Sequence, residues 1–132
     1  MDVGVPSNID RIQNLFHDDV KKIKVDISSW SVPDKDTKES IRNIQNEFGY
    51  LIDPHTAVGV LGLNKYRHET NCITKGVVLS TAHPGKFSDV IEPIIGDKTT
   101  LPESLQIAMK KEKQSIKMPK KFSDLKDYLL VV

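Results

Sequence analysis

The stretch VVLSTAHP, residues 77–84, decides the fold that the sequence predicts. Its first three residues, Val77–Leu79, form a continuous apolar run between polar residues, which is typical of a strand buried on both faces of a parallel sheet. Residues 1–5 form a second, weaker candidate strand, and helical patterns fill most of the sequence between the two. This order predicts an α/β fold with a partial parallel sheet flanked by helices. Because two strands are too few for a stable sheet, the others must lie in the predicted loops or in sequence outside this chain.

Apolar spacing and capping residues predict the helices that precede this strand. Ser7 is the expected N-cap of the first helix, and residues 18–27 either extend that helix or begin another. Asp36 or Thr37 caps the next helix, which Gly49 ends. The apolar face of that helix is formed by Ile41, Ile44 and Phe48.

The following helix has the clearest start in the sequence. Asp53 is the expected N-cap and Pro54 the first helical residue, and the helical pattern continues to residue 67. Gly59 and Gly62 lower its intrinsic helix propensity, so we expect either close packing against a neighbour or a ligand at these positions. Further helices are predicted over residues 84–96, 102–113 and 123–130.

Composition places the chain among ordinary single domains. Its 132 residues carry a formal charge of +1 and 38% hydrophobic residues, which suits one lean core. The balanced charge argues against nucleic-acid binding, and no apolar run approaches the ~20 residues that span a membrane. The one cysteine, Cys72, cannot form an internal disulfide, and residues 1–4 have no signal-peptide character, so we expect a cytoplasmic protein. We interpret residues 1–132 as one α/β domain or fragment, with residues 97–132 as its helical C-terminal extension.

Two groups of polar residues that could carry chemistry lie near predicted helix starts. Ser80 and Thr81 follow the predicted buried strand, at the edge where open α/β sheets bind ligands, and they could equally cap the helix that begins near Pro84. His55 stands in the first turn of a helix, where it could contact an anion or relay a proton. Ordinary helix capping accounts for the two residues before His55, and this simpler interpretation is favoured.

Ser7 and Asn8 form a third group, at a strand-to-helix turn where they could hold an anion beside Arg11. An N-cap and an exposed arginine explain the same residues and are the favoured interpretation. No metal site is expected, because the four histidines are scattered without zinc-ligand spacing. Cys72 is interpreted as a buried, inert thiol, and the lysines of residues 110–121 as a solvated face.

Three segments resemble those of threonine synthases, and they occur in the family's order. MDVGVPSNIDR at residues 1–11 resembles the family's MDVG-x-PSNF-x-R segment, and GYLIDPHTAVG at residues 49–59 resembles GYL-x-DPHTAVG. VLSTAHPGKF at residues 78–87 resembles VLSTAHPAKF, and residues 101–102 match the LP that follows it. The resemblance spans the whole chain and is specific because the three motifs occur together.

Two small departures from the family's pattern remove no polar group: Ile9 stands where Phe is usual, and Gly85 where Ala is usual. The resemblance implies a fold-type II enzyme that uses pyridoxal phosphate as its cofactor. It further implies conversion of O-phospho-L-homoserine and water to L-threonine and phosphate, with the cofactor as electron sink.

The resemblance also implies roles for individual residues. It places Thr81, with Ser80 beside it, at the pyridine nitrogen of the cofactor, where a neutral hydroxyl leaves that nitrogen largely unprotonated. The candidates for the substrate pocket or site wall are Ser7, Asn8, His55 and His83.

Two segments of the family have no counterpart in this sequence: the Ser-Phe-Lys-Asp-like segment with the Schiff-base lysine, and the Gly-Asn-Phe-Gly-Asn-like phosphate loop. Both lie upstream in the family, so we interpret the chain as the C-terminal portion of a threonine synthase, inactive alone, with Met1 as an internal methionine or the start of an expressed segment. Its expected partner is the N-terminal part of the same enzyme. The alternatives are a free-standing α/β module that binds a small anion or a partner protein, and another fold-type II enzyme, against which the DPHTAVG and STAHP segments argue.

Overall fold

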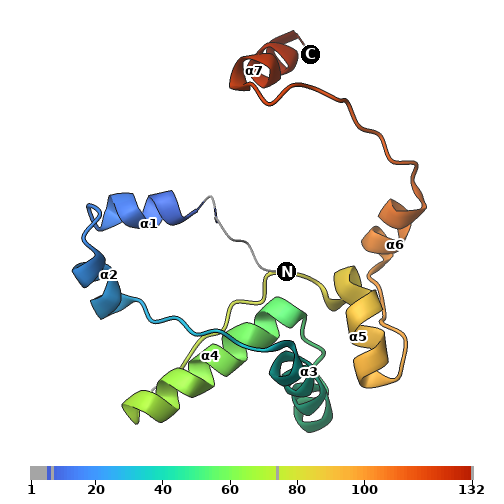
Figure 1. Cartoon of the computed structure of the whole chain (residues 1–132). Helices are drawn as coiled ribbons and strands as arrows, with labels where there is room; N and C mark the ends of the chain where they lie inside the picture. The colour runs from blue at the N-terminus through green and yellow to red at the C-terminus, as the bar shows by residue number, and fades with distance from the viewer. Residues whose placement is uncertain (1–5, 7, 74, 132) are drawn as a thin grey trace. The chain divides into compact units, whose positions relative to one another are not determined.

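The computed structural model describes residues 6, 8–73 and 75–131, and all regular secondary structure among them is helical (Figure 1). Contacts divide the chain into two units, residues 1–99 and residues 100–132. The helices of the first unit are α1 (Ile9–Leu15), α2 (Val20–Asp26), α3 (Asp34–Phe48), α4 (Pro54–Thr70), the 3₁₀ helix η1 (Pro84–Phe87) and α5 (Ser88–Ile95). Those of the second are α6 (Glu103–Lys110) and α7 (Phe122–Val131).

The core of the first unit lies where α3 packs against α4 and α5. Each of these helices contributes small or aliphatic side chains, and the link between α3 and α4 adds one more. The buried apolar residues are Ile41, Ile52, Ala57, Ile91 and Ile94. Full burial of an Ile side chain contributes about 1.5–3 kcal/mol, so this small set makes α3, α4 and α5 the stable part of the unit.

Left-handed residues end the core helices, as the sequence predicts. Gly49 after α3 and Gly96 after α5 have φ of +64° and +73°, a region that glycine enters without steric cost. The start of α3 differs from the prediction, because the helix begins at Asp34 rather than after Asp36 or Thr37. Pro33 occupies the N-cap position, and the carboxylates of the first turn favour the helix N-terminus. Phe48, predicted on the apolar face, is 65% exposed.

The first two helices are separate, which decides between the two alternatives that the sequence left open. His17 and Asp18 have positive φ and interrupt the helical path. Asp19 then caps α2, with its side chain accepting hydrogen bonds from the amides of Lys21 and Lys22. Asn8 is the N-cap of α1, and Ser7, the predicted cap, lies outside the described residues.

The predicted partial parallel sheet is not confirmed in the part of the chain that the structure describes. Residues 75–83 follow α4 without regular secondary structure, and no backbone hydrogen bond joins residues 75–82 to another described residue. Val77 and Leu79, expected to be buried on both faces, are 85% and 78% exposed, while Val78 between them is half-buried. A strand needs a ladder partner for its amides and carbonyls, and the only other predicted strand, residues 1–5, lies outside the described residues.

The second unit carries the two remaining helices. Neither α6 nor α7 has a buried residue, and residues 110–121, predicted to be a solvated face, are exposed throughout. None of the described helices, in either unit, is long and apolar enough to cross a membrane.

Close packing explains Gly59 but does not require a glycine at position 62. A Cβ atom at Gly59 would lie 3.0 Å from Val78 Cγ1, so the absence of a side chain lets residues 75–83 approach the helix. Gly62 faces Trp30, which packs edge-on against Tyr66 and donates a hydrogen bond from Nε1 to Glu69 (3.2 Å). A Cβ at Gly62 would stop 3.9 Å from the indole ring, an ordinary contact distance.

Alanine at the two glycines should therefore have different effects on stability. Gly62→Ala should stabilise the chain by about 0.5–1 kcal/mol, because helix propensity improves without a clash. Gly59→Ala should gain less or lose stability, because Val78 must move away. Urea denaturation followed by circular dichroism measures both, and an equal gain in the two variants would contradict the packing of Val78 on Gly59.

Candidate functional site

The candidate site begins with a buried carboxylate at the start of α4. Asp53 is fully buried and is the N-cap of α4, where its Oδ1 accepts hydrogen bonds from the amides of His55 (2.9 Å) and Thr56 (3.4 Å). Its Oδ2 accepts a short hydrogen bond from the Thr56 hydroxyl. A buried carboxylate needs such partners, because leaving it unpaired costs several kcal/mol. Asp53 thus fixes both the helix start and the Thr56 side chain.

Ser80 joins this pair from the irregular segment. Its Oγ lies 3.4 Å from the Oγ1 of Thr56, which is 5% exposed. Val78 packs on Gly59 one turn further along α4, so two contacts hold this segment along the first half of the helix. Asp53, Thr56 and Ser80 therefore form one polar group, in which Ser80 lies 24 positions after Thr56 in the sequence.

Thr81, the predicted cofactor contact, follows immediately and differs from Ser80. Its side chain is exposed, and its hydroxyl forms no hydrogen bond with any described residue. It does not stand at the end of a buried strand, since the structure forms no strand there, but at the end of an irregular segment. Both residues are exposed, but only the Ser80 hydroxyl has a contact among the described residues, the 3.4 Å approach to Thr56.

The two histidines predicted at the site wall stand in or beside helix first turns. His83 is the N-cap of η1, and its Nδ1 accepts a hydrogen bond from the Gly85 amide (3.1 Å). An accepting Nδ1 requires the neutral ring to carry its proton on Nε2. His55 is exposed and packs edge-on against Phe87, with 5.3 Å between ring centroids.

A cleft of about 430 Å³ opens beside His55. Its walls come from the loop before α3 and from α3, α4, η1 and α5, and the lining is mainly apolar. The lining residues include Val32, Ile41, Val58 and Val90, with Lys38 and Asp34 as the charged members. The sequence patterns did not predict this cleft, because its walls come from four separate elements.

Among the described residues, no contact brings Asn8 to this group. The Asn8 side chain makes no capping hydrogen bond, and no hydrogen bond joins it to Asp53, Thr56 or Ser80. Ser7 lies outside the described residues. Across the described residues, no group of three or more His, Cys, Asp or Glu side chains could hold a metal ion.

Sequence reasoning missed Thr56 and treated Asp53 as a cap alone. The available signal was the spacing: Thr56 is the third helical residue after an Asp N-cap, the relation of a capping box with the usual residue types exchanged. A hydroxyl at that position reaches back to the cap, and a buried pair of this kind is a rigid support for a neighbouring segment.

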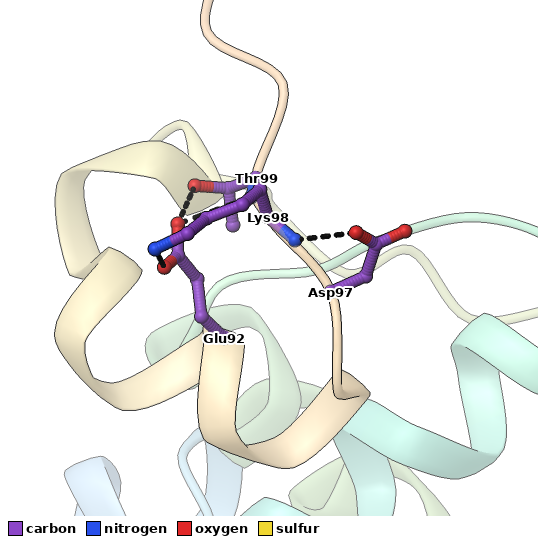
Figure 2. Close-up of polar contacts among 4 residues, drawn as sticks. All are labelled: Glu92, Asp97, Lys98 and Thr99. Atoms are coloured by element: carbon purple, nitrogen blue, oxygen red, sulfur yellow. Dashed lines mark hydrogen bonds and ion pairs between the residues drawn. The ribbon is translucent and has the colours of Figure 1, made fainter.

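A charged cluster fixes the chain after α5 (Figure 2). Glu92 accepts hydrogen bonds from Lys98 Nζ (2.8 Å) and from the amide (3.2 Å) and hydroxyl (3.1 Å) of Thr99. These contacts, the Lys98 hydrogen bond foremost, hold the pKa of Glu92 below its ordinary value of 4.5. The same bond raises the pKa of Lys98 above 10.5. Asp97 accepts a hydrogen bond from the Lys98 amide (2.7 Å). The carboxylates of Glu92 and Asp97 therefore both hold the loop that follows Gly96.

Glu92→Gln should cost stability in a pH-dependent way. A carboxyl whose pKa is lowered by folding stabilises the chain above its ordinary pKa, and this contribution disappears as the pH falls through the lowered value. The variant should therefore melt slightly below the unsubstituted chain at pH 7 and at the same temperature at pH 2. The effect should be small, because the pair is exposed and screened by salt. A melting difference that persists at pH 2 would contradict this assignment.

Comparisons with known proteins identify the family of the chain. The family model described as threonine synthase, C-terminal, matches residues 56–129, more than half of the chain. The threonine synthase of Serratia marcescens is 32% identical over 130 residues, which cover 98% of this chain and 29% of that protein. The crystal structure of threonine synthase from Escherichia coli superposes with a TM-score of 0.69 at 30% identity, covering 99% of this chain and 29% of that one.

A second solved structure supports the fold. The PLP-bound threonine synthase from Brucella melitensis has a TM-score of 0.56 at 24% identity, covering 98% of this chain and 32% of that one. The chain belongs to the threonine synthase family, and it corresponds to the C-terminal domain of that family. It spans about 29% of the length of the Serratia relative.

Proposed function

We propose that this chain is the C-terminal part of a threonine synthase, which converts O-phospho-L-homoserine and water to L-threonine and phosphate with pyridoxal phosphate. The observation that carries this proposal is the family match over residues 56–129, which includes the Thr56, Ser80 and Thr81 group. The relatives are threonine synthases, and one solved structure of the family is PLP-bound. Its place is the cytoplasm, a reducing compartment that suits a chain with one cysteine.

The residues present fit this cofactor. Thr81 offers an exposed hydroxyl without a partner among the described residues, which is the donor that an unprotonated pyridine nitrogen requires. Pyridoxal phosphate, when bound, supplies the electron sink for the reaction. Thr81 binds and orients its ring, and a neutral hydroxyl leaves the ring nitrogen without the full charge that a carboxylate partner would favour. The lysine and the phosphate loop that hold the cofactor belong to the N-terminal part of the enzyme.

The wall of the same site is proposed to include the other predicted residues. His55 lies in the first turn of α4, directly after the Asp53 cap, and His83 caps η1 two residues after Thr81. Ser7 and Asn8 are proposed for the same wall from their family motif.

Two variants of Thr81 test the cofactor contact in the full-length enzyme. Thr81→Val keeps the shape of the side chain but leaves the ring nitrogen unpaired, at a cost of about 1–3 kcal/mol. Cofactor affinity or turnover should fall roughly tenfold to a hundredfold, since about 1.4 kcal/mol corresponds to a factor of ten. Thr81→Ser, the matched control, retains the hydroxyl and most of the activity. A Thr81→Val enzyme equal to the wild type would mean that Thr81 is not the partner of the ring nitrogen.

We also propose that residues 77–79 form a strand of a parallel sheet when the N-terminal part of the enzyme is present. The alternating exposure of Val77, Val78 and Leu79 is the pattern of a strand with one side against α4. The backbone of residues 75–82 has no hydrogen-bond partner among the described residues, and a neighbouring strand would supply partners for it.

Amide hydrogen exchange tests this pairing. The amides of residues 76–80 should exchange rapidly in the isolated chain and at least about a hundredfold more slowly in the full-length enzyme, where ladder hydrogen bonds would protect them. The amides of α3 around Ile41 serve as the internal control, because they are helical in the isolated chain. Equal exchange of residues 76–80 in both proteins would refute the strand.

A further inference from the structure

Three hydroxyl and carboxyl groups form a chain from the buried start of α4 to the exposed segment. Asp53 and Thr56 are at least nine-tenths buried, with relative exposures of 0% and 5%. Asp53 accepts from the Thr56 hydroxyl, and Thr56 Oγ1 lies 3.4 Å from Ser80 Oγ. Thr81 stands next along the segment without a partner among the described residues.

Counting protons sets the direction of these bonds. A carboxylate only accepts, and a threonine hydroxyl has one proton to donate. Thr56 gives that proton to Asp53, so its oxygen can only accept in the second contact. The 3.4 Å contact can then be a hydrogen bond only with Ser80 as the donor to Thr56, and in that arrangement the single proton of Ser80 is used. Of the two adjacent hydroxyls, only Thr81 has a proton free for another acceptor.

We propose that Asp53 and Thr56 are positioning residues that make Thr81, rather than Ser80, the hydrogen-bond donor to the cofactor ring. This inference rests on the proposed function, because it concerns the same pyridine nitrogen. Asp53 and Thr56 do not touch the cofactor. They hold residues 75–83 along α4, and Thr56 accepts the hydrogen bond that Ser80 can donate. Thr81 is then the one hydroxyl of the two that donates to the pyridine ring.

The direction of the chain can be reversed by one nearly isosteric change. Asp53→Asn keeps a good N-cap, since Asn Oδ1 still accepts from the amides of His55 and Thr56. Its Nδ2 replaces Oδ2 and donates to Thr56, which then donates to Ser80. The Ser80 proton is released in this variant. Thr56→Val releases the same proton by removing its acceptor.

A double-mutant cycle on the full-length holoenzyme measures the coupling. Thr81→Val should weaken the binding of pyridoxal phosphate, followed by absorbance titration, about tenfold or more in the wild-type background. In the Asp53→Asn and Thr56→Val backgrounds the loss should shrink to about threefold or less, because Ser80 can replace the missing donor. Equal losses in all three backgrounds would overturn the proposal.

Two controls separate coupling from a general effect on folding. Asp19→Asn changes the N-cap of α2, where the carboxylate accepts from the backbone amides of Lys21 and Lys22 and pairs with the Lys22 side chain, and it should leave the Thr81→Val loss unchanged. Thr56→Ser retains the relay and should behave as the wild type. A Thr56→Ser enzyme that behaves like Thr56→Val would mean that side-chain packing, not the hydroxyl, produces the effect.

A measurement without cofactor distinguishes failure of this inference from failure of the proposed function. In the full-length apoenzyme, Thr56→Val should raise amide exchange across residues 78–83 several-fold, and Thr56→Ser should not. If exchange rises but Thr81→Val never affects cofactor binding, the positioning stands and the assigned cofactor contact is wrong. Unchanged exchange in Thr56→Val would refute the positioning role, whatever the cofactor does.

Discussion

The Asp53 carboxylate is the interaction on which the rest of the site depends. A fully buried carboxylate is tolerated only when its oxygens find donors, and here the first turn of α4 and the Thr56 hydroxyl supply them. The same residue ends the link from α3, in which Ile52 is buried in the core. One side chain therefore anchors the helix start, the core and the hydroxyl that meets Ser80.

In contrast to the buried Asp53 group, several large apolar side chains of the first unit are exposed. Val77 and Leu79 lie exposed on a segment whose backbone has no hydrogen-bond partner among the described residues, and Phe48 is exposed at the end of α3. Large apolar side chains gain by burial, and the chain spans only about 29% of the length of its Serratia relative. The proposed strand pairing would cover this segment with the part of the enzyme that precedes it.

Local chemistry made the helices predictable, and distant partners made the sheet unpredictable. Asp53, Pro54, Gly49 and Gly96 act through their own backbone torsions and nearest amides, so their positions identify helix ends without the fold. The run at residues 77–79 has strand character, yet a strand also needs a ladder partner that its own sequence cannot specify. The cleft beside His55 was unpredictable for the same reason, since four elements must meet before it exists.

Ser80 and Thr81 illustrate how structure adds to a motif. The motif contains two adjacent hydroxyls of similar chemistry, and capping or ligand binding explained them equally well from the sequence. Thr56 makes them different, because its hydroxyl proton is already donated in the hydrogen bond to Asp53. A hydroxyl that must donate inward cannot also donate outward, so the difference between Ser80 and Thr81 lies in the direction of a hydrogen bond and not in residue type. The Asp53 carboxylate, 27 positions before Ser80, sets that direction. From the sequence alone, Asp53 was explained fully as the N-cap of a helix.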